Sequence, residues 1–191
     1  MVYDIRNTSS HLHQLHIEKI TSKVPLHSLA VTSTDNKTTI LCADITHSHI
    51  WTMQGAEVHH SLLSVEENDY KPFSLSHDST SSSVMISLRN ATSTKHIIGM
   101  VDNASWKTSW SFESAHPQKA MTRTCHFMLN QKGIACFADE ETCSVILRDQ
   151  TNVIQNIPIG QPPVDIKHCR VGNSTILAVL TDNQLHLHKY L

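Results

Sequence analysis

The stretch that decides the fold is STILAVLTDNQLHLHKYL, residues 174–191. It begins with an apolar run typical of a buried strand and continues with the polar turn Thr-Asp-Asn. It then alternates, with Leu185 and Leu187 on one face and His186 and His188 on the other. The stretch is therefore predicted to be a β-hairpin. Its last strand needs a neighbour, because an unpaired sheet edge invites other chains to pair with it.

Three segments upstream repeat this hairpin pattern. They are residues 38–53, residues 133–149 and, more loosely, residues 82–101. When the ends of their second strands are aligned, equivalent positions lie about 42 to 49 residues apart, close to the period of a WD-repeat propeller blade. The aligned positions are Asp4, Trp51, Met100, Arg148 and Tyr190.

Two further strands are predicted between successive hairpins. A polar strand follows each hairpin, at residues 11–19, 57–63, 105–112 and 152–160. A second strand leads into the next hairpin, at residues 25–33, 70–77, 120–129 and 163–169. Each unit then holds four strands, the content of one propeller blade.

The predicted fold is all-β, an incomplete WD-repeat β-propeller with about four blades of four-stranded antiparallel sheet. The segment VYDIR, residues 2–6, occupies the place of the Trp-Asp dipeptide that names the repeat. The domain is predicted to span residues 1–191 as the C-terminal part of the propeller. Its blade units are roughly residues 1–20, 24–64, 70–113, 119–159 and 163–191.

This repeat predicts what lies beside the final strand. In a WD-repeat propeller, an N-terminal segment supplies the outer strand of the last blade and closes the ring. Because VYDIR has the features of a third strand and not of an outer strand, we expect the rest of the propeller upstream of Met1. A four-bladed ring closed by residues 1–6 is the alternative.

Composition limits the classes of partner. The formal net charge is −2, and the 15 Lys and Arg residues form no cluster, so direct nucleic-acid binding is not expected. No apolar run approaches the ~20 residues that span a bilayer, and no signal peptide begins the chain. Five cysteines without a CxxC pattern favour a reducing, intracellular compartment. Five Asn-x-Ser/Thr triplets leave a secreted or surface β-protein as an alternative.

Five segments of the chain resemble a known family. VYDIRNTSSHLHQL, PLHSLAV and ILCADITHSHIWTM in the first third, and LRDQTNVIQNIPIGQPPVDI and STILAVLTDNQLHLHKYL near the end, are collinear with it. They resemble the C-terminus of the RING-finger and WD-repeat E3 ubiquitin ligases of the replication-stress and interstrand-crosslink response. The similarity covers nearly all of the chain and is loosest through residues 55–130.

The resemblance implies a nuclear ligase with an N-terminal RING, a coiled coil and a C-terminal propeller that recognises partners, notably replication protein A. This chain would be the partner-recognition part of a ligase acting in the DNA damage response and in DNA repair at stalled replication forks. A RING needs eight Cys or His ligands in paired spacing around two zinc ions. The chain lacks that pattern, so zinc is expected only in the RING. A non-enzymatic WD-repeat scaffold is the alternative function.

No catalytic or metal site is predicted in this chain, and the sequence does not identify binding residues. Pairs of histidines two residues apart share a strand face and could ligate zinc, but no carboxylate or thiolate lies at a spacing that completes a site. These pairs, read as structural, are His11 with His13, His47 with His49, and His186 with His188. Cys125 and His126 are adjacent on a strand and should point to opposite faces, which disfavours a nucleophile–base pair.

The remaining candidates are cysteines, aromatic residues and a polar segment. Cys136 and Cys143 flank a turn and are expected to be buried thiols, with a disulfide as the alternative. Trp51 is expected to be buried between its own blade and the next. An aromatic cluster is expected to share one strand face and to pack between blades: Trp106, Trp110 and Phe112. Residues 74–83 are expected to be a solvated loop.

Overall fold

The computed structural model describes residues 2–4, 7–13, 15, 24–34, 36–63, 69–102, 105–114, 116–172 and 174–190. Every regular element in this part of the chain is a β-strand. The strands are β1 (Val2–Asp4), β2 (Asn7–His13), β3 (Ser28–Thr34), β4 (Lys37–Ala43), β5 (Ser48–Gln54), β6 (Glu57–Leu62), β7 (Lys71–Asp78), β8 (Ser83–Arg89), β9 (Thr94–Asp102), β10 (Ser105–Ser114), β11 (Cys125–Leu129), β12 (Lys132–Asp139), β13 (Ser144–Arg148), β14 (Val153–Pro158), β15 (Asp165–Val171), β16 (Ser174–Leu180) and β17 (Leu185–Tyr190). Within these described ranges, no helix could cross a bilayer.

The strands form five antiparallel sheets, and neighbours in each sheet are also neighbours in the chain. The sheets are β1–β2, β3–β6, β7–β10, β11–β14 and β15–β17. Antiparallel neighbours need only tight turns between them, which explains why short polar segments separate the strands. The predicted all-β class with antiparallel sheets is confirmed.

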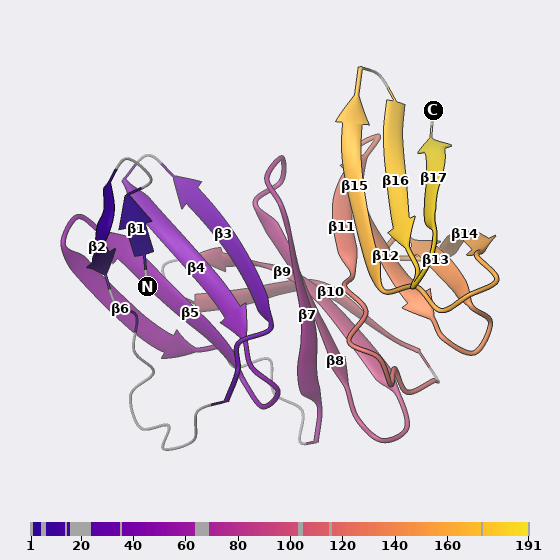
Figure 1. Ribbon diagram of the computed structural model, residues 1–191, viewed down its shortest axis with the longest axis horizontal. Helices are drawn as coiled ribbons and strands as arrows, with labels where there is room; N and C mark the ends of the chain where they lie inside the picture. The colour runs from indigo at the N-terminus through magenta and orange to yellow at the C-terminus, as the bar shows by residue number, and fades with distance from the viewer. Residues whose placement is uncertain are drawn as a thin grey trace.

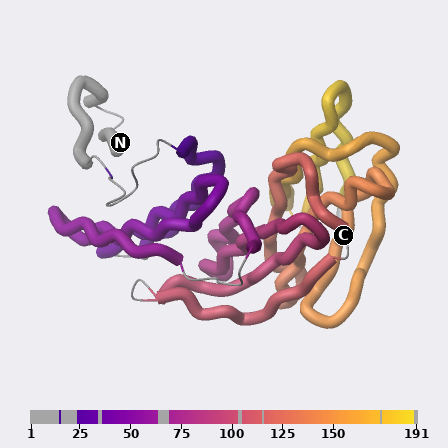
Figure 2. Tube along the Cα trace, turned by 90° about the horizontal axis from the view of Figure 1, so that it is seen from below, coloured from indigo at the N-terminus to yellow at the C-terminus, as the bar shows by residue number. Residues whose placement is uncertain are grey.

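The sheets follow one another along an arc, as Figure 1 shows. The first strand of each larger sheet lies on the inner side of the arc, with β3 against β7, β7 against β11 and β11 against β15. Figure 2 shows the same succession from below, with the sheets in chain order from the indigo N-terminal side to the yellow C-terminal side. This is the arrangement of blades in an incomplete WD-repeat propeller, as the sequence predicted.

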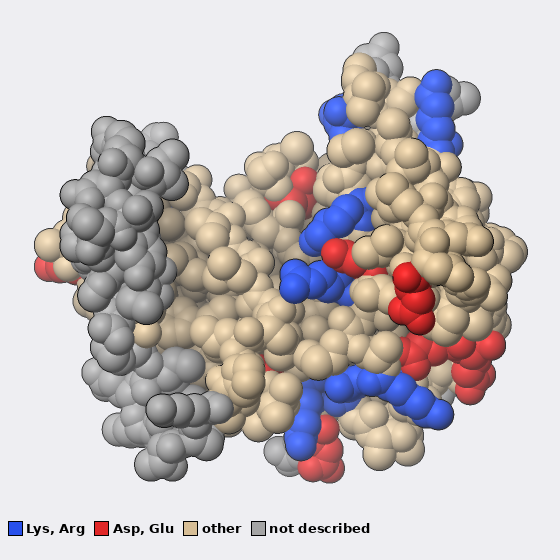
Figure 3. Space-filling view, in the orientation of Figure 1, with Lys and Arg blue, Asp and Glu red and all other residues tan. Residues whose placement is uncertain are grey.

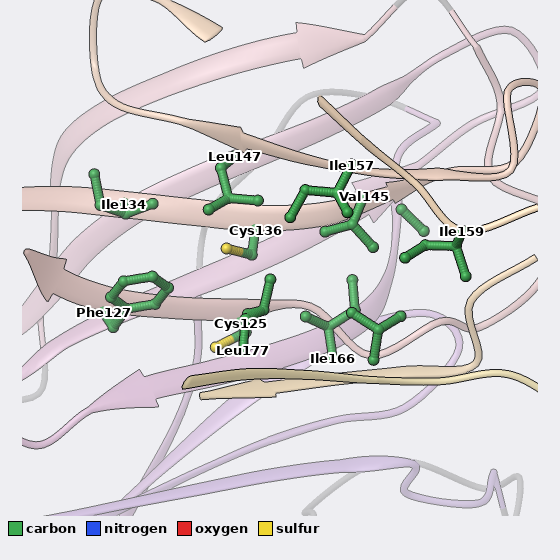
Figure 4. Close-up of a cluster of buried hydrophobic side chains, with 12 residues drawn as sticks. Cys125, Phe127, Ile134, Cys136, Val145, Leu147, Ile157, Ile159, Ile166 and Leu177 are labelled. Carbon is green, nitrogen blue, oxygen red and sulfur yellow. The ribbon is translucent and has the colours of Figure 1, made fainter. Parts of the chain in front are cut away.

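Apolar side chains hold successive sheets together. Figure 4 shows the largest cluster, which lies between the β11–β14 sheet and the β15–β17 sheet. Its members include Cys136, Val145, Ile166, Leu177 and Val179, all with no exposed surface. Fully burying one such aliphatic side chain stabilises the fold by about 1.5–3 kcal/mol. Alternation explains the cluster, because every second residue of β12, β13 and β16 faces the neighbouring sheet.

Several turns share one polar device. The side-chain oxygen of an Asp or Asn accepts hydrogen bonds from the backbone amides two and three residues further on. This arrangement holds a turn without a glycine. The residues that act in this way are Asp44, Asp78, Asn90, Asp139 and Asp149. At Asn90 the device accounts for one of the five Asn-x-Ser/Thr triplets, because Thr92 also donates its hydroxyl to the Asn90 oxygen.

The strand β17 is the third strand of the last sheet, as predicted. It pairs with β16 on one side, and no other described strand pairs with it. β1 pairs with β2 and lies at the opposite end of the arc in Figure 1. Residues 2–4, the described part of the segment 1–6, form β1 and do not pair with β17. The alternative of a ring closed by this segment is therefore wrong for these residues. On the outer face of the last sheet, Leu185 is 62% exposed and Leu187 is 64% exposed.

Candidate functional site

The adjacent residues Cys125 and His126 point to opposite faces of β11. The Cys125 Sγ atom lies 3.0 Å from Nδ1 of His168, whereas Nδ1 of His126 lies 3.1 Å from the Ser83 hydroxyl. Burial raises the pKa of the Cys125 thiol to about 12. A thiol with that pKa stays protonated at neutral pH and is a poor nucleophile. The pair of Cys125 and His168 is therefore a packed contact and not a catalytic dyad.

The cysteine pair that flanks the β12–β13 turn is not joined. Cys136 lies opposite Cys125 across the two strands, and both thiols are free. Cys143 is also free and lies in the turn, with its sulfur 3.7 Å from the Glu140 carbonyl oxygen. Burial holds the pKa of Cys136 well above its usual range, which makes it a buried apolar group.

Histidine 49 is part of a buried polar cluster on the β4–β6 hairpins. Its Nε2 atom lies 3.1 Å from the Asp44 carboxylate, and its Nδ1 atom lies 3.2 Å from Nε2 of His60. The rings of Trp51 and His60 stack with centroids 4.8 Å apart. Four hydrogen bonds from Thr46, His47 and His49 to Asp44 lower the pKa of that carboxyl to about 2, against the effect of its burial. These contacts are structural, because Asp44 is also held by Thr46 and His47 in its own turn and His60 lies on the neighbouring strand β6.

Trp51 is buried, with 2% of its surface exposed, but it faces the other way from the prediction. It packs with Ile40 and Cys42, and Leu15 and Met53 lie against this cluster. Leu15 follows β2 in the chain, so Trp51 faces the preceding unit and not the following blade. The reason is strand parity: the opposite faces of β4 and β5 form the cluster shared with the next sheet.

The histidine pair on β17 stays on one face, as alternation predicts. The rings of His186 and His188 are nearly parallel, with centroids 6.4 Å apart. Burial, followed by the neighbouring His186, lowers the pKa of His188. Within the described ranges, no group of three or more His, Cys, Asp or Glu residues could hold a metal ion. The pair formed by His11 and His13 lies on β2, whose side chains are outside the described part.

Residues 74–83 are not a loop over their whole length. Ser74 and Ser76 belong to β7, are buried, and accept hydrogen bonds from the backbone amides of Thr124 and His126. Beyond β7, a chain of hydrogen bonds joins Asp78, Ser81, Ser83 and His126 across two sheets. The solvated-loop prediction was wrong here because these hydroxyls find partners on the next inner strand.

The aromatic cluster on β10 is divided between two faces. A bulge between Thr108 and Trp110 shifts the register, so alternation does not continue from Trp106 to Trp110. Trp106 packs against the cluster shared with the β3–β6 sheet. Trp110 and Phe112 pack towards the β11–β14 sheet, where the Phe112 ring lies 5.2 Å from Phe137 and 4.3 Å from the Arg148 guanidinium carbon. Packing between blades is confirmed, whereas the single shared face was wrong.

The repeat alignment is also displaced at one position. On β9, Val101 packs towards the β3–β6 sheet, so its neighbour Met100 faces the opposite way. Trp51 and Arg148 both face the preceding unit. Met100 is therefore one residue out of register with them.

Among the described residues, a groove of about 740 Å³ lies at one end of the β7–β10 sheet. Its walls come from three chain segments that meet there: the start of β7, the β8–β9 turn and the loop between β10 and β11. The lining residues are Asp69, Lys71, Arg89, Asn90, Ala91, Pro117, Gln118 and Lys119. We call this feature the β7–β10 groove. Figure 3 shows Lys and Arg side chains gathered at the lower ends of β7 and β8.

The β10–β11 loop is fixed against this groove by Arg89. The Nη1 atom of Arg89 donates to the carbonyl oxygens of Gln118 at 2.9 Å and Ala120 at 3.2 Å, and also to that of Lys119. From the other side, the Glu140 carboxylate accepts the backbone amides of Lys119 and Ala120. The groove wall is therefore held in place before any partner arrives. No pattern in the sequence predicted this groove, and the cross-strand pairing of Lys71 with Arg89 is the signal that could have pointed to it.

Comparison with known proteins gives one family. The family model described as the WD40 domain of E3 ubiquitin-protein ligase RFWD3 matches residues 1–189. A comparison with curated proteins gave no match. The matched span takes in every sheet described above except the last residue of β17, Tyr190.

Proposed function

Because the chain belongs to the family of RFWD3 WD40 domains, we propose that it is the partner-recognition propeller of a RING-type E3 ubiquitin ligase. The ligase would act in the nucleus, in the DNA damage response and in DNA repair at stalled replication forks. The observation that carries the proposal is the family match over residues 1–189.

The proposed mechanism is proximity. The propeller binds the target protein, and a RING elsewhere in the ligase positions a conjugating enzyme loaded with ubiquitin. Tethering both partners raises the effective concentration of the acceptor lysine near the ubiquitin thioester. The chain's own residues contribute binding and orientation. Its five cysteines lack the paired spacing of a RING, so zinc ligation and ubiquitin transfer are not assigned to it.

Replication protein A is the proposed partner, and direct binding tests the proposal. Isothermal titration calorimetry of the chain with purified replication protein A should give saturable binding with one class of site. Trp51→Ala should weaken binding only as far as it populates the unfolded chain, because Trp51 is 2% exposed and not available to a partner. No heat of binding from a chain shown to be folded would refute the proposal.

A non-enzymatic scaffold is the second candidate. Among the described contacts, Cys125 is the one cysteine beside a histidine ring nitrogen, and its raised pKa makes this pair unsuitable as a catalytic dyad. The two candidates differ in what happens after binding. If the chain directs a fused RING to ubiquitinate replication protein A, the ligase function holds. If replication protein A is bound but not modified in that fusion, the scaffold function holds.

A further inference from the structure

The β7–β10 groove carries an excess of positive charge. Three cationic residues line it, Lys71, Arg89 and Lys119, against one acidic residue, Asp69. Among the described ion pairs, none involves any of these three cations. The excess is local, because the whole chain has a net charge of −2.

Two of these cations lie directly opposite each other. Lys71 on β7 pairs in register with Arg89 on β8. Like charges at opposed positions of an antiparallel pair destabilise a sheet. The carbonyl oxygens that accept from Arg89 offset part of this cost, and no described ion pair joins a carboxylate to Lys71 or Arg89. An anionic group bound in the groove would neutralise the repulsion.

The lining of the groove favours a peptide over a nucleic acid. One wall is a backbone loop held in place by Arg89 and Glu140. No aromatic side chain lines it, which disfavours stacking of nucleic-acid bases. Three cations are also few for a nucleic-acid backbone, which is usually bound by more phosphate contacts.

We propose that the β7–β10 groove binds an acidic peptide segment of a protein partner, with carboxylates held between Lys71 and Lys119 and beside Arg89. The inference rests on the proposed function, since it gives the chemistry and the place of partner recognition. Attraction between exposed charges is screened by salt, so binding should weaken as ionic strength rises.

The test uses the whole chain and a fluorescein-labelled peptide of alternating Glu and Ser, followed by fluorescence anisotropy. A peptide of alternating Gln and Ser is the neutral comparison. The variant Lys71→Glu/Lys119→Glu should bind the acidic peptide at least about tenfold more weakly, as expected for removing two close charge contacts. The matched control is Lys107→Glu/Lys167→Glu, which changes the net charge equally at two exposed lysines outside the groove and should change affinity less than about twofold.

Thermal unfolding separates lost binding from lost structure. The Lys71→Glu change places a carboxylate opposite Arg89, so the midpoint temperature should hold or rise while peptide binding falls. Equal weakening by both double variants would overturn the inference, as would tighter binding of a single-stranded DNA oligonucleotide. Absence of any acidic-peptide binding by a chain that still binds replication protein A would overturn the inference alone. Failure to bind replication protein A would overturn the proposed function alone, because the peptide assay still reports on the groove.

Discussion

The substitution Gly99→Ala probes the place where β9 and β10 approach most closely. A Cβ atom at Gly99 would lie 2.4 Å from the carbonyl oxygen of Lys107 and 2.6 Å from Cζ2 of Trp106. Neither contact is compatible with van der Waals radii, so β10 would have to move. Replacing a strand glycine with alanine ordinarily stabilises by roughly 0.5–1 kcal/mol. Here we expect a loss of about 2–3 kcal/mol, in the upper range for overpacking.

Urea unfolding of the purified chain measures this loss as a fall in the free energy of unfolding. Gly133→Ala is the matched control, because its Cβ would lie 3.1 Å from Nε2 of His126, a milder approach than at Gly99, and should cost less than about 1 kcal/mol. In a Trp106→Ala background, Gly99→Ala should cost less than it does alone, since the clash with the Trp106 ring is gone and only that with the Lys107 carbonyl oxygen remains. If Gly99→Ala unfolds within about 0.5 kcal/mol of the parent chain, the packing of Trp106 over Gly99 is wrong.

Trp51→Ala should cost about 3–5 kcal/mol in urea unfolding, and a change below about 0.5 kcal/mol would contradict its burial. Burial lowers the pKa of His96 to about 3 and that of His126 to about 4, below the unfolded value near 6.5, so their unfolded forms take up protons first as pH falls. Stability should therefore be complete above pH 6.5 and fall by about 4 kcal/mol at pH 5, an effect that His96→Gln and His126→Gln should each reduce. The chain incubated with activating enzyme, conjugating enzymes and ubiquitin should form no ubiquitin conjugates above a ligase-free control, and conjugates above that level would contradict the missing RING pattern. The chain should self-associate through its exposed apolar face, and light scattering should detect the oligomers. Leu185→Glu/Leu187→Lys should reduce the association, and a monodisperse parent chain would contradict the prediction.

The hairpins were predictable because local signals agree with the tertiary structure. In the last hairpin, the apolar run, the turn at Thr181 and the alternation of β17 all point to one arrangement. Each of these signals acts over a few residues, so no knowledge of distant partners is needed. The burial of Trp51 was predictable for the same reason, since it sits within an alternating strand of a repeated unit.

The sheet that each strand side chain faces was less predictable, because one inserted residue moves the following side chains to the other face. The bulge after Thr108 sends Trp106 and Trp110 to different sheets, although their spacing of four residues predicts one shared face. The signal for the bulge lies across the strand pair, where Gly99 makes room for Trp106. The buried serines of β7 were missed for a related reason: their partners, Thr124 just before β11 and His126 on β11, are 50 residues away in the chain.

The β7–β10 groove shows the same limit at the level of function. Lys71, Arg89 and Lys119 carry no common sequence spacing, and each alone is typical of a solvated surface. They meet because the turn after Asp78 sets Lys71 opposite Arg89, and because Arg89 then holds the loop that contains Lys119. Register therefore determines the electrostatics of the groove. A shift of one residue in β7 would move Lys71 to the other face of the sheet, where it could no longer contribute to an anion-binding surface.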